Sequence, residues 1–150
     1  MIKVIILDSG PLGLLVQRKG VIPADQCRDW FKNHLARGLR FVIPEIADYE
    51  VRRELIRISK FAAISDLDSL EVVPGAYAPL TTIAIRLAAN LWAQARTGGF
   101  PTADPRELDA DVLIAAQALS LGIVPADLVV ATSNPSHISR FAPADLWQNI

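Results

Sequence analysis

Short β-branched apolar runs alternate with longer segments of helical periodicity along the whole chain, and this alternation constrains the fold most strongly. Strands are predicted at residues 2–7, 41–43, 70–73 and 128–131, and the tail from residue 141 is expected to add a short edge strand. Helices are predicted at residues 23–38, from 44 into 62, 79–96 and 108–121, with a proline-containing loop at 100–107. This order is typical of an α/β fold with a mostly parallel sheet covered by helices on both faces.

Length and composition narrow the class of protein. A chain of 150 residues with 51% hydrophobic residues can bury a core of its own, which predicts a single domain over residues 1–150. The longest apolar stretch, residues 112–126, is too short and too interrupted to span a membrane, and the N-terminus lacks the pattern of a secretory signal. Cys27 is the only cysteine, so no internal disulfide is possible. We therefore expect a cytoplasmic location and a buried, unreactive thiol.

Charge is uneven although the formal net charge is only −1. Residues 1–60 are net basic and residues 61–150 are net acidic. A polyanion could meet the basic part while the acidic part supplies carboxylates, but two solvated faces of opposite sign explain the pattern equally well.

The first predicted strand ends at Asp8, followed by the turn Ser9-Gly10-Pro11. Sites in open α/β sheets gather outside the carboxyl ends of the strands, where Thr132 and Asn134 also follow the predicted strand 128–131. Asp8 is therefore a candidate site residue. The alternative is that it caps a helix beginning near Pro11.

Glu50, Asp109 and Asp111 are the other candidate acids. Each has an ordinary explanation: Glu50 pairs with Arg53 one turn away, and the two aspartates favour the positive end of their helix. Asp111, however, opens a helix that is nearly free of charge at its start and must be largely buried. Gathered carboxylates repel one another, and a divalent cation relieves that repulsion.

Oxygen ligands without a Cys or His cluster suit Mg²⁺ or Mn²⁺, which bind phosphates and activate water. Glu50, on a separate helix, would steer or deprotonate the water rather than hold the metal. His34 and His137 are too isolated in the sequence to indicate a zinc site, and a structural or surface role is expected for both.

Four segments together resemble PIN-domain proteins, and the size resembles the stand-alone VapC-like toxins. These segments are VIILDSGPLG, IPEIADYEVRREL, LDADVLIAAQALSLGI and LVVATSNPSHISRF. The resemblance implies a three-layer α/β/α fold and a metal-dependent endoribonuclease that hydrolyses RNA phosphodiester bonds with Mg²⁺ or Mn²⁺. It assigns the catalytic acids to Asp8, Glu50 and Asp111, with Asp8 and Asp111 on the metal. It further implies a homodimer and a cognate antitoxin in a type II pair.

The chain departs from the family pattern where many relatives carry a fourth acid. That region reads Thr132-Ser133-Asn134, so either Thr132 and Asn134 complete the site through water, or Asp109 supplies the missing charge on the metal, or activity is weak. Gly10 and Pro11 also depart from the usual continuation, whereas Ser9 keeps a hydroxyl able to orient Asp8.

Basic residues on or beside the Glu50 helix are candidates to bind the RNA backbone: Arg52, Arg53, Arg57 and Lys60. A solvated or salt-bridged helix face is the competing explanation, expected to hold for at least half of them. Trp30, Trp92 and Trp147 are interpreted as core or interface residues rather than as a stacking platform.

Two other functions compete with the nuclease. A catalytically weak or inactive PIN-like module that associates with RNA or a protein partner would account for the missing acid. Phosphoryl transfer through an aspartyl-phosphate at Asp8 is disfavoured, because Gly10 stands where a second acid is needed and no lysine follows Lys60. Phosphate-loop and dinucleotide-binding glycine signatures are absent.

Overall fold

The computed structural model describes residues 1–99 and 105–150, and the side chains of 1–99 and 110–150. Within these residues the chain forms one five-stranded sheet in the order β3-β2-β1-β4-β5, with every neighbouring pair parallel. The strands are β1 (Val4–Leu7), β2 (Arg40–Pro44), β3 (Tyr77–Ala78), β4 (Leu128–Thr132) and β5 (Ala144–Leu146). The predicted parallel sheet is confirmed, including the edge strand in the tail.

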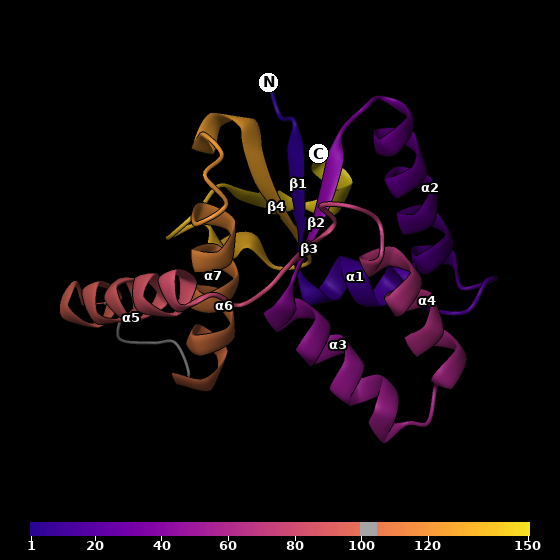
Figure 1. Cartoon of the computed structure of the whole chain (residues 1–150), viewed down its shortest axis with the longest axis horizontal. Coiled ribbons are helices and arrows are strands. Elements are labelled where there is room, and N and C mark those ends of the chain that lie inside the picture. The colour runs from indigo at the N-terminus through magenta and orange to yellow at the C-terminus, as the bar shows by residue number, and fades with distance from the viewer. Residues whose placement is uncertain (100–104) are drawn as a thin grey trace.

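Helices cover both faces of the sheet (Figure 1). One face carries α1 (Ser9–Leu15), α2 (Ile22–Ala36), α3 (Glu45–Arg57) and α4 (Phe61–Glu71). The other carries α6 (Pro105–Leu119), with α5 (Thr82–Thr97) packed on it, and α7 (Pro135–Ile138). A short 3-10 turn at Pro125–Asp127 precedes β4, and another at Trp147–Asn149 lies next to the last residue. The three-layer α/β/α architecture is therefore confirmed.

The central strand β1 explains why the core divides into two halves. Ile5 and Leu7 point to the side of α1 to α4, whereas Val4 and Ile6 point to the side of α6. All four are buried, as expected for a strand flanked by β2 and β4 and covered on both faces. An unbroken apolar run is the sequence signature of that environment.

The predicted strand at residues 70–73 is wrong. This segment is the last turn of α4 and the connection after it, and the third strand comes later, at Tyr77–Ala78. Leu67 is fully buried, and Leu70 packs one turn later against the same core. A short apolar run at the end of a buried helix has no period that distinguishes it from a strand.

The helix predicted from residue 44 into 62 is two helices. Ser59 adopts a left-handed φ of +56°, and the backbone N–H of Lys60 donates to the carbonyl of Leu55 over 2.9 Å, which closes the end of α3.

The helix α6 begins at Pro105, earlier than the predicted residue 108, and residues 100–104 of the predicted loop lie outside the described part. In the described residues, no helix is long and apolar enough to cross a membrane.

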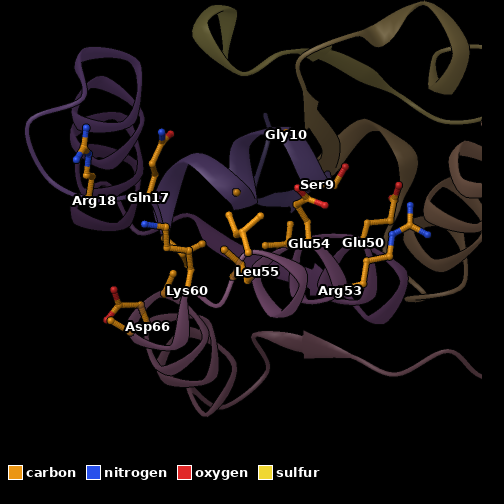
Figure 2. Close-up of a pocket in the computed structure, with 16 residues that line it drawn as sticks. Ser9, Gly10, Gln17, Arg18, Glu50, Arg53, Glu54, Leu55, Lys60 and Asp66 are labelled. Atoms are coloured by element: carbon orange, nitrogen blue, oxygen red, sulfur yellow. The ribbon is translucent and has the colours of Figure 1, made fainter.

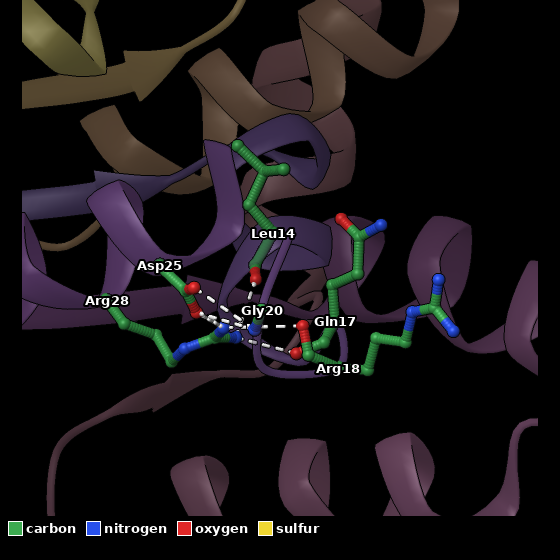
Figure 3. Close-up of polar contacts among 6 residues, drawn as sticks. All are labelled: Leu14, Gln17, Arg18, Gly20, Asp25 and Arg28. Carbon is green, nitrogen blue, oxygen red and sulfur yellow. Dashed lines mark hydrogen bonds and ion pairs between the residues drawn. The ribbon is translucent and has the colours of Figure 1, made fainter. Parts of the chain in front are cut away.

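The connection from α1 to α2 is held by Arg28 (Figure 3). Its guanidinium donates to three backbone carbonyl oxygens at the end of α1, those of Leu14 (3.4 Å), Gln17 (2.6 Å) and Arg18 (3.4 Å). It also pairs with Asp25, which in turn accepts the backbone N–H of Gly20 over 3.1 Å. These bonds tie the last turn of α1 and the residues after it to α2.

The exposure of the side chains tests the packing roles predicted for the three tryptophans and for Cys27. Trp30 and Trp147 are buried and contact each other edge to face, with ring centroids 5.7 Å apart. Trp92 is 38% exposed, with the Arg96 guanidinium 4.8 Å from its ring centroid. Cys27 is fully buried, and burial raises the pKa of its thiol to about 12, which confirms the expected unreactive role.

Candidate active site

A cleft of about 480 Å³ opens beside the carboxyl ends of β1 and β4. It brings together Asp8, Glu50 and Asp111, which come from three different segments of the chain. The lining residues are Asp8, Ser9, Gly10, Glu50, Arg53, Ala110, Asp111, Thr132, Ser133, Asn134 and His137. The three candidate acids and the three supporting residues named from the sequence therefore share one concave surface.

Asp8 caps a helix and also lines the cleft, so both positions that the sequence allowed for its side chain are occupied at once. Its Oδ1 accepts the backbone N–H of Ser9 over 2.7 Å and caps α1. Its Oδ2 accepts a hydrogen bond from the Thr132 hydroxyl over 2.6 Å, within the cleft. Ser9 contacts the carboxylate twice, because its hydroxyl also donates to Oδ1 over a longer 3.5 Å, so the backbone N–H makes the shorter bond.

Thr132 is almost completely buried at the end of β4. While its hydroxyl donates to Asp8, its oxygen accepts the backbone N–H of Asn134 over 3.1 Å. This relay ties the turn after β4 to the end of β1. It gives the Asp8 carboxylate one preferred orientation, since both of its oxygens are hydrogen-bonded.

Glu50 lies on α3, across the cleft from β4. Burial raises the pKa of its carboxyl above the ordinary value, the charge of Asp8 raises it further, Arg53 opposes the shift, and Asp111 adds to it. Glu50 therefore lies in the electrostatic field of both other acids, which is the crowding of carboxylates that the sequence predicted.

Asp111 does not open its helix, as the sequence predicted, because α6 already begins at Pro105; it lies within the helix, immediately before the buried Val112. Its Oδ2 lies 3.1 Å from Nδ1 of His137, which belongs to α7. His137 is a cleft residue that sequence reasoning missed, since it was expected to be structural or superficial. The only signal was its place three residues after Asn134, in the segment that resembles the last family motif.

Gly10 is required by the close approach of α1 to the turn after β4. A Cβ at this position would overlap the hydroxyl oxygen of Ser133 and lie 3.1 Å from its Cβ. The departure from the family pattern at Gly10 therefore has a local steric reason, since the backbone of α1 forms part of the cleft wall.

The four candidate RNA-binding residues separate into two groups. Arg53 lines the cleft, with its guanidinium 5.1 Å from the ring centroid of Tyr49, and Lys60 lines a neighbouring groove. Arg57 does not line the cleft and pairs with Glu54 over 2.5 Å. Arg52 does not line it either, because its guanidinium is held by carboxylates of α3 and α4. The salt-bridge explanation therefore holds for Arg52 and Arg57.

A carboxylate cluster surrounds Arg52 and joins α3 to α4. The guanidinium contacts Asp48 (2.8 Å), Asp68 (2.7 Å) and Glu71 (3.5 Å). Burial raises the pKa of Glu71 to about 8, and a hydrogen bond with Asp48 and the Asp48 charge add to the shift. Asp48 is not among the acids singled out from the sequence, although its spacing of four from Arg52 is a signal for this ion pair.

A larger groove of about 840 Å³ continues from the cleft between α1, α3 and α4 (Figure 2). The two share Ser9, Gly10, Glu50 and Arg53. The floor is apolar and the far end carries polar and charged groups. The apolar lining is Val16, Val51, Leu55, Ile58, Ala62 and Ala63, and the far end holds Gln17, Arg18, Lys60 and Asp66.

The donor set of the cleft can be compared with the needs of a divalent cation. Its acids offer hard oxygen donors, and their mutual repulsion favours a cation among them. Among the described side chains, no three of the His, Cys, Asp and Glu type converge on one point. Mg²⁺ is commonly held by one or two carboxylates with water completing the shell, so the donor chemistry fits. The side chain of Asp109 lies outside the described residues.

Comparison with known proteins places the fold. No family model and no curated protein matches the chain in sequence. Solved structures do match. A chain of FitAcB from Neisseria gonorrhoeae is 17% identical, with a TM-score of 0.68 over 97% of this chain and 99% of that one. A chain of VapBC2 from Rickettsia felis, bound to a promoter DNA fragment, is 15% identical, with a TM-score of 0.68 over 96% and 98%.

A third structure, DNA-bound VapBC from Salmonella typhimurium, gives 22% identity and a TM-score of 0.61 over 98% of this chain and 99% of that one. Together the sheet, its helical layers and these matches define an α/β protein with a carboxylate-lined cleft at its strand ends. Its fold is the PIN-like fold that the sequence resemblance predicts.

Proposed function

We propose that this protein is a metal-dependent endoribonuclease, the toxin of a type II toxin–antitoxin pair. One observation supports this more than any other: Asp8, Glu50 and Asp111, from three distant segments, line a single cleft at the carboxyl edge of the sheet. The similarity of the fold to VapBC and FitAB structures agrees with it. Such a protein would work in the cytoplasm, where its RNA substrate is found.

Asp8 and Asp111 would hold Mg²⁺ or Mn²⁺, with Thr132 and Asn134 supporting the site and Asp109 as a further candidate ligand. The ion would supply Lewis acidity toward water and the phosphate. The chain's own contribution is orientation, since Asp8 is held by the Ser9 backbone and the Thr132 hydroxyl. Preorganised donors reduce the reorganisation that a reaction requires.

Glu50 would accept a proton from the attacking water. A general base works best when its pKa lies close to the operating pH, and burial and the two neighbouring acids move Glu50 in that direction. Arg53, which also lines the cleft, would contact the phosphate backbone. Arg52 is the weaker candidate because carboxylates of α3 and α4 hold its guanidinium, and Arg57 lies outside the cleft in an exposed pair with Glu54.

The direct test is cleavage of a generic single-stranded RNA by the purified protein with Mn²⁺, with and without EDTA. Asp8→Asn should abolish cleavage. Asp29→Asn, the same chemical change on an exposed position of α2, should leave it intact. If the wild-type protein binds RNA without cutting it under these conditions, the alternative function is favoured, an inactive PIN-like binding module. The missing fourth acid is consistent with that alternative.

The groove next to the cleft is the proposed docking site for a segment of the cognate antitoxin. Its apolar floor and its continuity with the acidic cleft suit a peptide with apolar side chains and a basic residue at the cleft end. The similar VapBC and FitAB structures are assemblies of two proteins, which supports a partner here.

Co-expression with the product of the neighbouring reading frame tests this partner. Ala62 is exposed and lines the groove, so Ala62→Glu should prevent co-purification without affecting the fold. Ala93→Glu, at an exposed position on α5, is the matched control. Equal co-purification of both variants would remove the groove from the interface. The homodimer that the resemblance implies is part of the same proposal, and sedimentation of the isolated protein measures it.

A further inference from the structure

We propose that His137 is a positioning residue for Asp111, so that the end of β4 and the short helix after it orient both acids proposed to hold the metal. The inference rests on the proposed metal-dependent function, which it deepens. An ionised carboxylate only accepts hydrogen bonds, so the 3.1 Å contact requires the His137 Nδ1 to carry the proton and donate to Asp111 Oδ2.

Both partners are held by buried structure. Next to Asp111, Val112 is 2% exposed, and next to His137, Ile138 is fully buried. The short helix α7 is closed by the backbone N–H of Ser139, which donates to the carbonyl of Pro135 over 2.9 Å. Neither side chain therefore sits on a free loop, and their contact restricts the rotation of Asp111.

Asp8 is held in a similar way by the last residue of β4. The hydroxyl of Thr132 donates to Asp8 as the ring of His137 donates to Asp111, and both donors line the cleft. The end of β4 and the short helix α7, on either side of the turn after β4, thus supply one hydrogen-bond donor each in this chain. Groups that hold a ligating carboxylate commonly change metal affinity 10- to 100-fold when removed.

A simple tether between α6 and α7 is the competing role, and the shape of asparagine separates the two. The amide nitrogen of asparagine lies near the place of the histidine Nδ1, whereas that of glutamine lies nearer Nε2. His137→Asn should therefore keep the bond to Asp111, and His137→Gln and His137→Ala should lose it.

The experiment is calorimetric titration of MnCl₂ into the apo protein, with thermal unfolding in EDTA measured alongside. His137→Ala and His137→Gln should raise the Kd about 10-fold or more, and His137→Asn should stay within about 3-fold of the wild type. Ser139→Ala, exposed on the same short segment, is the control and should match the wild type.

Each outcome has one meaning. If His137→Ala binds Mn²⁺ like the wild type while Asp111→Asn does not, the positioning role is wrong and the proposed function stands. The role is also wrong if His137→Asn unfolds at the wild-type temperature but binds as weakly as His137→Ala. If the wild type itself gives no binding heat, the metal-dependent function fails, and this inference fails with it.

Discussion

The hydroxyl of Thr132 donates a 2.6 Å hydrogen bond to the carboxylate of Asp8, a residue 124 positions away in the chain. The contact exists because β1 and β4 are adjacent and parallel, with Leu7 in register with Ala131. Each residue is the first after that pair, so the end of one strand orients the side chain that follows the other. The cleft is therefore a consequence of the strand order.

Replacing Thr132 by valine keeps the shape of the side chain and removes the donor. We expect Thr132→Val to lower Mn²⁺ affinity and to reduce the free energy of unfolding by about 1 kcal/mol, because Asp8 and the Asn134 N–H each lose a partner. Thr132→Ser should restore both. Calorimetry and urea unfolding measure the two effects, and unchanged affinity in the valine variant would contradict the orienting role.

The two roles of Asp8 can be separated by mutation. Asparagine caps helices as well as aspartate does, but its amide nitrogen cannot accept the hydrogen bond of the Thr132 hydroxyl, so Asp8→Asn should lose RNA cleavage with a smaller loss of stability than Asp8→Ala. Asp8→Ala should lose cleavage and also about 1 kcal/mol of stability, because the Ser9 N–H is left uncapped. Comparison of urea unfolding with RNA cleavage checks both. Cleavage by Asp8→Asn at the wild-type rate would remove this carboxylate from the chemistry.

Gly10 and Gly13 both lie in α1, so the same substitution by alanine can be compared at the two positions. A Cβ at Gly13 would meet only Val51, at an ordinary 3.9 Å, so Gly13→Ala should stabilise the helix by about 0.5 kcal/mol. Gly10→Ala should be destabilising and should also impair cleavage, because the methyl group displaces Ser133 at the cleft wall. Thermal unfolding and an RNA cleavage assay give the comparison. Stabilisation by Gly10→Ala would show that Ser133 moves without cost.

Replacement of the adjacent arginines Arg52 and Arg53 on α3 should affect different properties, stability for Arg52 and RNA binding for Arg53. Arg52→Ala leaves the Asp48 carboxylate without its cation, and we expect a loss of about 1 kcal/mol in stability, because the cluster is partly exposed. Arg53→Ala should change stability little and weaken RNA binding, with a smaller dependence of affinity on salt. Urea unfolding and fluorescence anisotropy at several salt concentrations distinguish them. If Arg52→Ala instead weakens RNA binding and leaves stability unchanged, Arg52 belongs to the RNA-binding surface.

The sequence predicts those features that depend on neighbouring residues. The buried strand before Asp8 and the uncharged run after Asp111 are both visible as local patterns, and strand alternation places the end of the strand at one edge of the sheet. The role of His137 is not visible, because it depends on how α7 packs beside α6. The break at Ser59 is also hidden, because serine carries no signal for the left-handed conformation found there.

The last prediction concerns pH and the carboxylate cluster around Arg52. Burial raises the pKa of Glu71 from an ordinary 4.5 to about 8, so the folded protein keeps a proton on this residue that the unfolded chain has released. Between pH 4.5 and 8 this residue therefore makes the folded state bind more protons than the unfolded chain, and we expect its contribution to stability to fall as pH rises, by at most about 1.4 kcal/mol per pH unit.

Asp48 does not cancel this slope. Burial opposes its ionisation, but hydrogen bonds with Arg52 and Glu71 hold the pKa of Asp48 below its ordinary value of 3.8, outside the window. Asp68, on the same helix as Glu71, and Tyr77, at the edge of the sheet, are the other titratable groups near the cluster. Tyr77 stays neutral here because burial and a hydrogen bond with Glu45 raise its pKa.

Glu71→Gln carries the neutral form at every pH, so its unfolding free energy should lose most of the decline between pH 5 and 8. Above pH 8 the variant should be more stable than the wild type, whose Glu71 is then ionised beside Asp48. Glu54→Gln, in an exposed pair with Arg57, should keep the wild-type slope. Urea unfolding at pH 5, 7 and 9 measures all three proteins. Parallel pH profiles for Glu71→Gln and the wild type would mean that Glu71 is ionised in the folded state and that Arg52 balances the cluster at neutral pH.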